Sequence, residues 1–172
     1  VIDTGTRRVV TFDLDGSYVA EWVDIDASAI TVGPDGRVYA TDREANAVVA
    51  FDAGGARLFA FGSLGSDDGQ FTLMADVSVS PDGRTIAVAD LNLLRVQLFD
   101  LGPTGATHRR TYLLNHPKFS PRAVGPPYNQ CRAGVVFALG DDAVWVGDGT
   151  GACRITPDGF SYTIAGSAAG GT

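Results

Sequence analysis

The chain of 172 residues carries thirteen basic and twenty acidic residues, which gives a formal net charge of −7 at neutral pH. A nucleic-acid groove needs a basic surface because binding neutralises phosphates, so this balance excludes nucleic acid as an expected partner. Hydrophobic residues make up 45% of the sequence, yet no apolar run approaches the length of a membrane-spanning helix. We therefore expect a compact domain with no membrane-spanning segment.

The same eleven-residue string occurs three times, at 3–13, 42–52 and 90–100. Each copy has Asp at both ends, Val at the seventh place and Phe at the tenth. The starts lie 39 and 48 residues apart, so each repeat is a unit of about four short strands. This period is typical of the blade of a β-propeller.

Short apolar runs separated by Pro-Asp-Gly turns predict the strands of these blades. No segment shows a sustained helical period with caps, so we expect almost no helix. Runs such as Ile86–Ala89 are apolar at every position, which indicates a strand buried between two neighbouring sheets. The expected strands are 29–32, 38–41, 48–51, 58–61, 77–79, 86–89, 96–99, 111–114, 135–139, 144–146, 153–155 and 160–164.

The predicted fold class is all-β, a β-propeller of four-stranded antiparallel blades, with about three and a half blades in this chain. It is a single domain with the parts 1–27 (part-blade), 28–75 (blade), 76–133 (blade with a long loop at 115–134) and 134–172 (blade).

The repeats are similar to those of the NHL family. Asp-x-x-x-x-Arg-Val-x-x-Phe-Asp at 90–100, preceded by Ser-Pro-Asp-Gly-Arg-Thr-Ile-Ala-Val-Ala, resembles an NHL repeat, and 62–71 resembles the Gly-rich connection to the next repeat. Ala47 departs from the pattern because Arg8 and Arg95 occupy this place in the other copies. NHL propellers usually have about six blades, which corresponds to roughly 240–290 residues. The resemblance therefore implies that this chain is a portion of a longer protein. The alternative is that the chain is complete and forms an open arc of blades that pairs with the arc of another subunit. The expected partner of the terminal blades is therefore either the remaining blades of the same protein or another copy of the arc.

Charge is unevenly distributed along the sequence. The forty residues 101–140 contain no acidic residue, although they hold five of the thirteen basic residues and both histidines. They include the longest connection, 115–134, and long loops without secondary structure are commonly functional or disordered. We predict a docking surface for a protein partner or an acidic or anionic ligand, the alternative being a Pro-stiffened excursion with no partner. The candidate binding residues are His116, Lys118, Arg122, Tyr128 and Arg132.

The two cysteines are predicted to form a disulfide. Cys131 precedes the first strand of the last blade and Cys153 follows its second strand, and these two connections share a rim. With no other Cys/His cluster, metal binding by the pair is not expected. A disulfide indicates an oxidising compartment, so we expect an extracytoplasmic location: secreted, periplasmic or at the cell surface. Two free buried thiols are the alternative.

The repeated residues Asp3, Asp42, Asp90, Arg8 and Arg95 are interpreted as structural positions. An Asp that ends a strand usually accepts backbone hydrogen bonds in the following loop, so no calcium site is expected there. We find no catalytic residue, no metal site and no cofactor motif in the sequence.

Two classes of function remain. The favoured prediction is a non-enzymatic propeller that serves as a protein- or ligand-binding scaffold, because the resemblance to NHL propellers implies such a platform. The alternative is a propeller enzyme, a metal-dependent lyase or lactonase-type hydrolase, whose active-site residues lie mostly in blades absent from this chain. The fold alone cannot decide between them.

Overall fold

The computed structural model describes residues 1–114, 134–137, 144–147, 151–156 and 161–166, and every regular element in this part of the chain is a β-strand. The strands form one three-stranded and three four-stranded sheets, each ordered as in the sequence and antiparallel throughout. The sheets are β1 (Ile2–Asp3), β2 (Arg8–Phe12), β3 (Tyr18–Val23); β4 (Ala27–Val32), β5 (Val38–Asp42), β6 (Ala47–Phe51), β7 (Arg57–Phe61); β8 (Met74–Val79), β9 (Thr85–Asp90), β10 (Arg95–Leu101), β11 (Ala106–Leu113); and β12 (Gly134–Phe137), β13 (Val144–Gly147), β14 (Gly151–Ile155), β15 (Ser161–Gly166).

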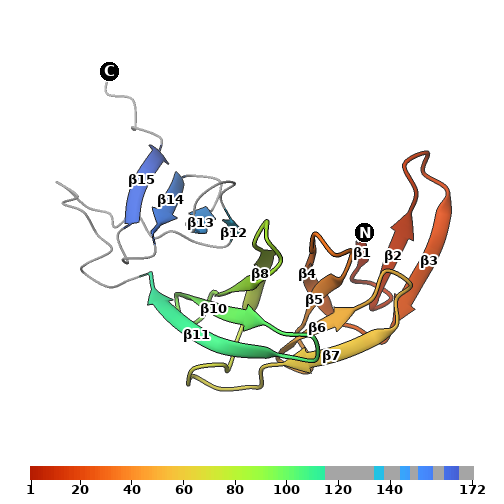
Figure 1. Cartoon of the computed structure of the whole chain (residues 1–172), viewed down its shortest axis with the longest axis horizontal. Helices are drawn as coiled ribbons and strands as arrows, with labels where there is room; N and C mark the ends of the chain where they lie inside the picture. The colour runs from red at the N-terminus through yellow and green to blue at the C-terminus, as the bar shows by residue number, and fades with distance from the viewer. Residues whose placement is uncertain (115–133, 138–143, 148–150, 157–160, 167–172) are drawn as a thin grey trace.

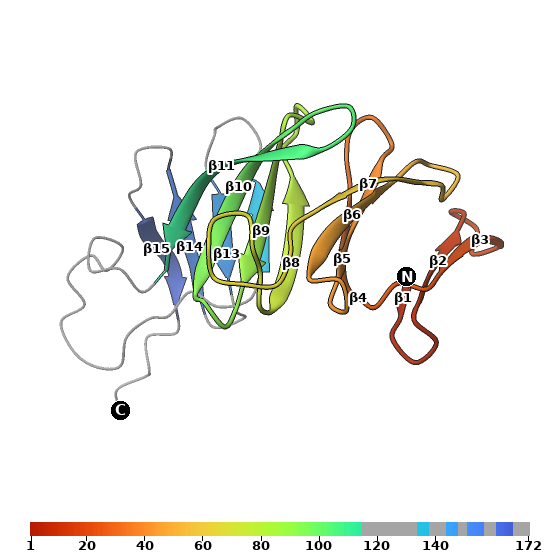
Figure 2. The ribbon, with the colours of Figure 1, turned by 90° about the horizontal axis from the view of Figure 1, so that it is seen from below.

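The four sheets are arranged as a fan. In Figure 1 they follow an arc, with β4 and β8 toward its concave side and β7 and β11 along its convex side. Figure 2 shows the strands of successive sheets standing side by side. The first strand of each sheet contacts the first strand of the next, since β8 lies against both β4 and β12. Among the described residues there is no helix at all, and so none that could cross a membrane.

The predicted fold class is confirmed: the chain is all-β and built from four-stranded antiparallel sheets. Most strands are longer than their sequence pattern indicated, and β8 and β11 are two examples. β8 begins at Met74 rather than Val77, and β11 spans Ala106–Leu113 rather than 111–114. Both extensions contain polar residues that do not follow the apolar pattern used to predict strands.

The core consists of three apolar layers, one between each pair of neighbouring sheets. Successive side chains of a strand point to opposite faces, so each central strand fills two layers at once. In β9, Ile86 and Val88 pack toward the second sheet, whereas Ala87 and Ala89 pack toward the fourth. All residues of β6 and β9 are buried, which explains why their sequences lack polar alternation. The layer between the first two sheets is centred on Trp22, whose indole stacks on the ring of Phe51 at 5.0 Å.

Loops of two kinds close the two rims of the fan. One rim carries the tight turns, in which an Asp side chain accepts a backbone N–H, as Asp35 does from Arg37 at 3.1 Å. The other, which we call the connection rim, carries the loops 4–7, 43–46 and 91–94 and the connections 24–26 and 62–73.

The three loops of the connection rim share one unusual backbone position. Arg7, Asn46 and Leu94 are the last loop residues of their repeats, and all have positive φ, at 53°, 50° and 46°. Left-handed backbone is costly for most residues with a side chain, and Asn tolerates it best. The three loops therefore adopt the same left-handed backbone conformation at this position although their sequences differ.

Candidate functional site

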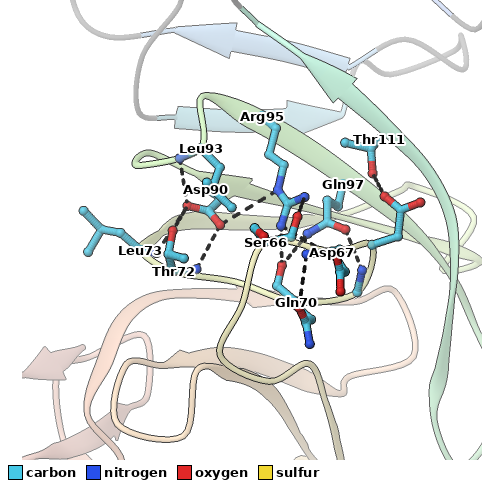
Figure 3. A network of polar contacts seen from close by, with 12 residues as sticks. Ser66, Asp67, Gln70, Thr72, Leu73, Asp90, Leu93, Arg95, Gln97 and Thr111 are labelled. Atoms are coloured by element: carbon cyan, nitrogen blue, oxygen red, sulfur yellow. Dashed lines mark hydrogen bonds and ion pairs between the residues drawn. The ribbon is translucent and has the colours of Figure 1, made fainter.

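A buried polar cluster of the connection rim is built on the start of β10 and the end of β9. Asp90 and Arg95 are almost completely buried, with 1% and 5% of their surface exposed. They face the connection 62–73, which leads from the second sheet to the third, as Figure 3 shows. A buried charge is costly unless it is paired and hydrogen-bonded, so the contacts of these two groups define the role of the cluster.

Arg95 binds the backbone of the connection. Its Nη1 donates to the carbonyl oxygen of Ser66 at 2.8 Å, and its Nη2 donates to the carbonyl oxygens of Asp67 and Gln70 at 3.2 and 2.7 Å. Its Nε lies 4.0 Å from the Asp90 carboxylate and is a buried donor with no hydrogen-bond partner. The planar fork of a guanidinium suits this arrangement because it presents several donors in fixed directions.

Gln97 binds the same segment two residues further along β10. Its side-chain amide donates to the carbonyl oxygen of Gln70 at 2.7 Å, and its carbonyl oxygen accepts from the N–H of Gly69 at 2.8 Å. Gln97 is fully buried, so both halves of its amide need these partners. Phe71 then inserts into the core between the second and third sheets.

Asp90 fixes the last part of the connection. Its carboxylate accepts from the N–H and the hydroxyl of Thr72, both at 3.0 Å, and from the N–H of Leu73 at 3.2 Å. A longer bond of 3.4 Å comes from the N–H of Leu93 in the following loop. Together with Arg95 and Gln97, Asp90 forms a network that holds the third sheet against the connection from the second.

The two other repeated aspartates have simpler surroundings. Asp3 Oδ1 accepts from the N–H groups of Gly5 and Thr6 at 3.1 and 3.2 Å. Asp42 Oδ1 accepts in the same way from Glu44 and Ala45 at 3.1 and 3.2 Å. In the part of the chain that the structure describes, no group of three His, Cys, Asp or Glu side chains could hold a metal ion.

Hydrogen bonds lower the pKa of three carboxyl groups. The Thr6 hydroxyl, followed by Arg8, lowers the pKa of Asp3 on the connection rim. On the opposite rim, the Ser80 hydroxyl lowers the pKa of Asp82. There, too, a hydrogen bond shared with the Asp13 carboxyl, followed by bonds to Ser17, lowers the pKa of Asp15 to about 2. These carboxylates remain ionised at neutral pH, and none has the raised pKa of a general acid.

Strand β8, which lies toward the concave side of the fan, carries a carboxylate that the sequence reading overlooked. Asp76 lies on β8, the first strand of the third sheet, and is half-buried; its Oδ1 accepts from the N–H of Val77 at 2.9 Å. Close by, the Ser28 hydroxyl of β4 donates to the carbonyl oxygen of Met74 at 2.9 Å and so joins the first strands of two sheets. The expected strand began at Val77, so Asp76 was not considered as a site residue, because a carboxylate interrupts the apolar pattern used to predict strands.

The residues predicted to bind a partner lie outside the described part of the chain. These are His116, Lys118, Arg122, Tyr128 and Arg132, and Cys131 belongs with them. Cys153 is on β14, where it is paired in register with Val146 and Thr163. The docking surface and the disulfide therefore remain predictions. The five repeat positions, in contrast, all lie on or beside the connection rim.

Comparisons with known proteins identify the fold. No family model and no curated protein matches this chain. Among solved structures, virginiamycin B lyase from Staphylococcus aureus matches 94% of the chain with a TM-score of 0.61 and 15% identity, and the chain covers 50% of that protein. A streptogramin B lyase matches 96% of the chain (TM-score 0.65, 16% identity, 50% of that protein covered). A gluconolactonase from Xanthomonas campestris matches 97% (TM-score 0.63, 16% identity, 58% covered).

The chain has a β-propeller fold. It spans about half the length of the solved propellers that it matches. At these identities the likeness concerns the fold alone, and membership of the NHL family is not among the findings.

The comparisons correct the predicted function. Most of the named neighbours are enzymes, among them two lyases, a gluconolactonase and dihydro-heme d1 dehydrogenase NirN. The prediction of a non-enzymatic scaffold is therefore wrong, and the neighbours favour its alternative, a propeller enzyme. The scaffold was favoured because of the resemblance to NHL propellers, and such a resemblance concerns the fold, which many unrelated functions share.

Proposed function

We propose that this chain is part of a propeller enzyme of the lyase or lactonase type. The observation that carries the proposal is the match of 94–97% of the chain to propellers whose names include two lyases and a gluconolactonase. Because the chain covers about half of those proteins, the activity belongs to the assembled propeller, to which this chain contributes one side.

We also propose that the blades are NHL repeats. The motif at 90–100 and the Gly-rich connection 62–73 support this assignment. The positions that define the motif, Asp90 and Arg95, are the residues that bind the connection through its backbone. This binding tolerates different side chains in the connection, because every residue has a backbone carbonyl group that can accept the hydrogen bond.

The active site is proposed to lie on the concave side of the fan, where the first strands of the sheets meet. Asp76 supplies a carboxylate there, on a strand flanked by β4 and β12. A carboxylate in such a position can hold a substrate hydroxyl or transfer a proton. The resemblance to enzymatic propellers implies a metal in the channel, but the described residues do not form a metal site by themselves.

The acid-free stretch 101–140 is proposed to attract an acidic or anionic ligand. It contains five basic residues in a protein of net charge −7, and such a local excess concentrates anions near the surface at low ionic strength. An extracytoplasmic location is part of the same proposal and depends on the Cys131–Cys153 pairing.

The test is an activity assay of the assembled propeller that contains this chain, with two substrate classes, streptogramin B and gluconolactone, each followed by mass spectrometry with and without added divalent cations. We expect turnover of one class, and a loss of at least tenfold in kcat for Asp76→Asn, in line with removal of a proton-transfer group. Asp100→Asn is the matched control because Asp100 is 61% exposed and lies on the third strand of the same sheet. Equal activity of Asp76→Asn and wild type would remove Asp76 from the site, and no turnover of either class by folded protein would refute the proposed function.

A further inference from the structure

A hydroxyl group connects the first strand of the second sheet to that of the third, and both strands lie toward the concave side of the fan (Figure 1). The Ser28 hydroxyl of β4 donates to the carbonyl oxygen of Met74 on β8 at 2.9 Å. The Thr41 hydroxyl of β5 lies 2.8 Å from the Ser28 oxygen. A hydroxyl has a single proton, and that of Ser28 goes to Met74, so Thr41 is the donor in this second contact. The two side chains therefore form a directed chain of hydrogen bonds, from Thr41 through Ser28 to Met74.

The backbone of β4 fixes Thr41 in turn. Thr41 is completely buried, and its hydroxyl oxygen accepts from the N–H groups of Ser28 and Ala29, at 3.2 and 2.9 Å. These contacts fall in the β-bulge that β4 forms between Ala27 and Ile30. Because two backbone donors hold the Thr41 oxygen in the interior, Thr41 keeps the Ser28 hydroxyl directed at the next sheet.

The Met74 carbonyl stands at the start of a second bulge. Strand β8 shifts its register between Met74 and Asp76, and Ala75 is the extra residue. A bulge disrupts the backbone ladder locally and re-aims the side chains beside it, and bulges are common next to active sites. Ser28 supplies the carbonyl before this bulge with a donor from the neighbouring sheet. Asp76 therefore follows a piece of backbone that is held from outside its own sheet.

The equivalent places of the third sheet carry no hydroxyl. In the repeat, Ala89 takes the place of Thr41. In the bulge of β8, Ala75 takes the place of Ser28. The third and fourth sheets are nonetheless packed together, by an apolar layer that includes Ala89. A pair of hydroxyls is therefore not required to pack one sheet on the next, and the pair beside the bulge of Asp76 has a different role.

We propose that Ser28 is a positioning residue, which holds the bulge of β8 and through it the Asp76 carboxylate in the orientation that the reaction uses. The inference rests on the proposed function, with Asp76 as the proton-transfer group. Such a group acts only within hydrogen-bond reach of its target, so a small displacement of its strand lowers the rate. Thr41 acts one step further back, because it orients the Ser28 hydroxyl.

The test is amide hydrogen exchange, resolved to single amides, in the assembled propeller that contains this chain. The variant is Ser28→Ala, and the matched control is Thr31→Val, at another half-buried hydroxyl residue of β4. The Val77 amide reports the position of Asp76, because it donates to that carboxylate at 2.9 Å. We expect its exchange to become about fivefold faster in Ser28→Ala, as for the loss of one hydrogen bond, and to stay unchanged in Thr31→Val.

A second amide separates a local effect from a general one. The Gly69 amide donates to Gln97 on the third strand of the same sheet, and its exchange should be equal in wild type and Ser28→Ala. Faster exchange at Gly69 and Val77 alike would mean that the substitution loosens the whole sheet, and would overturn a specific role in holding the bulge.

Steady-state kinetics with the substrate that the wild-type propeller turns over gives the catalytic readout. We expect kcat to fall about fivefold in Ser28→Ala while KM changes by less than about twofold, because a displaced proton-transfer group affects the transition state rather than substrate binding. Loss of packing between the sheets alone would lower the thermal unfolding midpoint without this difference between kcat and KM.

The possible outcomes separate this inference from the proposed function. Equal exchange at Val77 in Ser28→Ala and Thr31→Val would overturn the positioning of the bulge. Faster exchange with an unchanged kcat in an active enzyme would overturn its link to the reaction. Absence of turnover by the wild-type propeller would refute the proposed function and with it the catalytic part of the inference, whereas the exchange measurement would still decide whether Ser28 holds the bulge.

Discussion

Replacing Arg95 by methionine tests whether the connection 62–73 is held by its backbone contacts. The substitution keeps the apolar stem but removes the donors that bind the carbonyl groups of Ser66, Asp67 and Gln70. It also leaves the buried carboxylate of Asp90 without the guanidinium 4.0 Å away. Both losses destabilise the folded state.

The expected cost follows from burial. Removing one partner of a buried ion pair costs about 3–5 kcal/mol, and each lost hydrogen bond to a charged group is worth about 1.5–3 kcal/mol, although these terms overlap. Asp90 keeps hydrogen bonds from Thr72 and Leu73, which limits the penalty for its unpaired charge. We therefore expect the free energy of unfolding to fall by about 3–5 kcal/mol.

The assay is urea unfolding of the full chain, with Arg43→Met as the control. Arg43 forms an ion pair with Asp26 on the same rim, but its side chain is 43% exposed, so its loss should cost no more than about 1 kcal/mol. Hydrogen exchange adds a local readout: protection of the Gly69 amide, which donates to Gln97, should fall in Arg95→Met. If Arg95→Met costs no more than Arg43→Met, the connection is held by apolar packing and the reasoning is refuted.

Three further predictions concern a turn, a titrating group and the cysteines. Gly55→Ala should destabilise the first two sheets by more than about 1 kcal/mol, because a Cβ there would lie 1.9 Å from the Trp22 indole nitrogen and φ is +88°; a thermal unfolding midpoint equal to wild type would contradict this. The pKa of Asp15 is about 2 in the folded state and near 3.8 in the unfolded state, so its contribution to stability is complete above pH 3.8 and is lost as the pH falls toward 2. Asp15→Asn should therefore reduce the dependence of the unfolding free energy on pH in that window, and an unchanged dependence would refute the prediction. Mass spectrometry of non-reduced peptides should find Cys131 linked to Cys153; two free thiols in protein from its native source would remove the argument for export.

Much of the fold could be predicted from the sequence because the three repeats share the same residues at fixed places. Turns such as Pro34-Asp35-Gly36 and the fully apolar strand Ile86–Ala89 carry local signals, and both are present in the structure as expected. β11 was underestimated because it is the outermost strand of its sheet. Its residues Arg109 and Arg110 are exposed and need no apolar alternation, whereas the ring of His108 packs edge-on against Phe99.

The polar network of the connection rim could not be predicted. Arg95 contacts groups 25 to 29 residues away, and the contacts involve backbone carbonyls that any sequence possesses. The motif showed that the arginine recurs, but its partner became visible only when the third sheet was seen beside the connection. Asp76 was missed for a different reason, since a single carboxylate interrupts the apolar pattern of an inner strand.

The left-handed position shared by Arg7, Asn46 and Leu94 has a consequence for how such a rim can diversify. One backbone shape accepts a cation, an amide or an aliphatic group at the same spatial position in successive repeats. The backbone conformation of the loop therefore does not depend on which side chain the loop exposes at this position. A lineage could exchange the displayed groups one at a time while the scaffold underneath stays constant, and an engineer could use the same three places as grafting points.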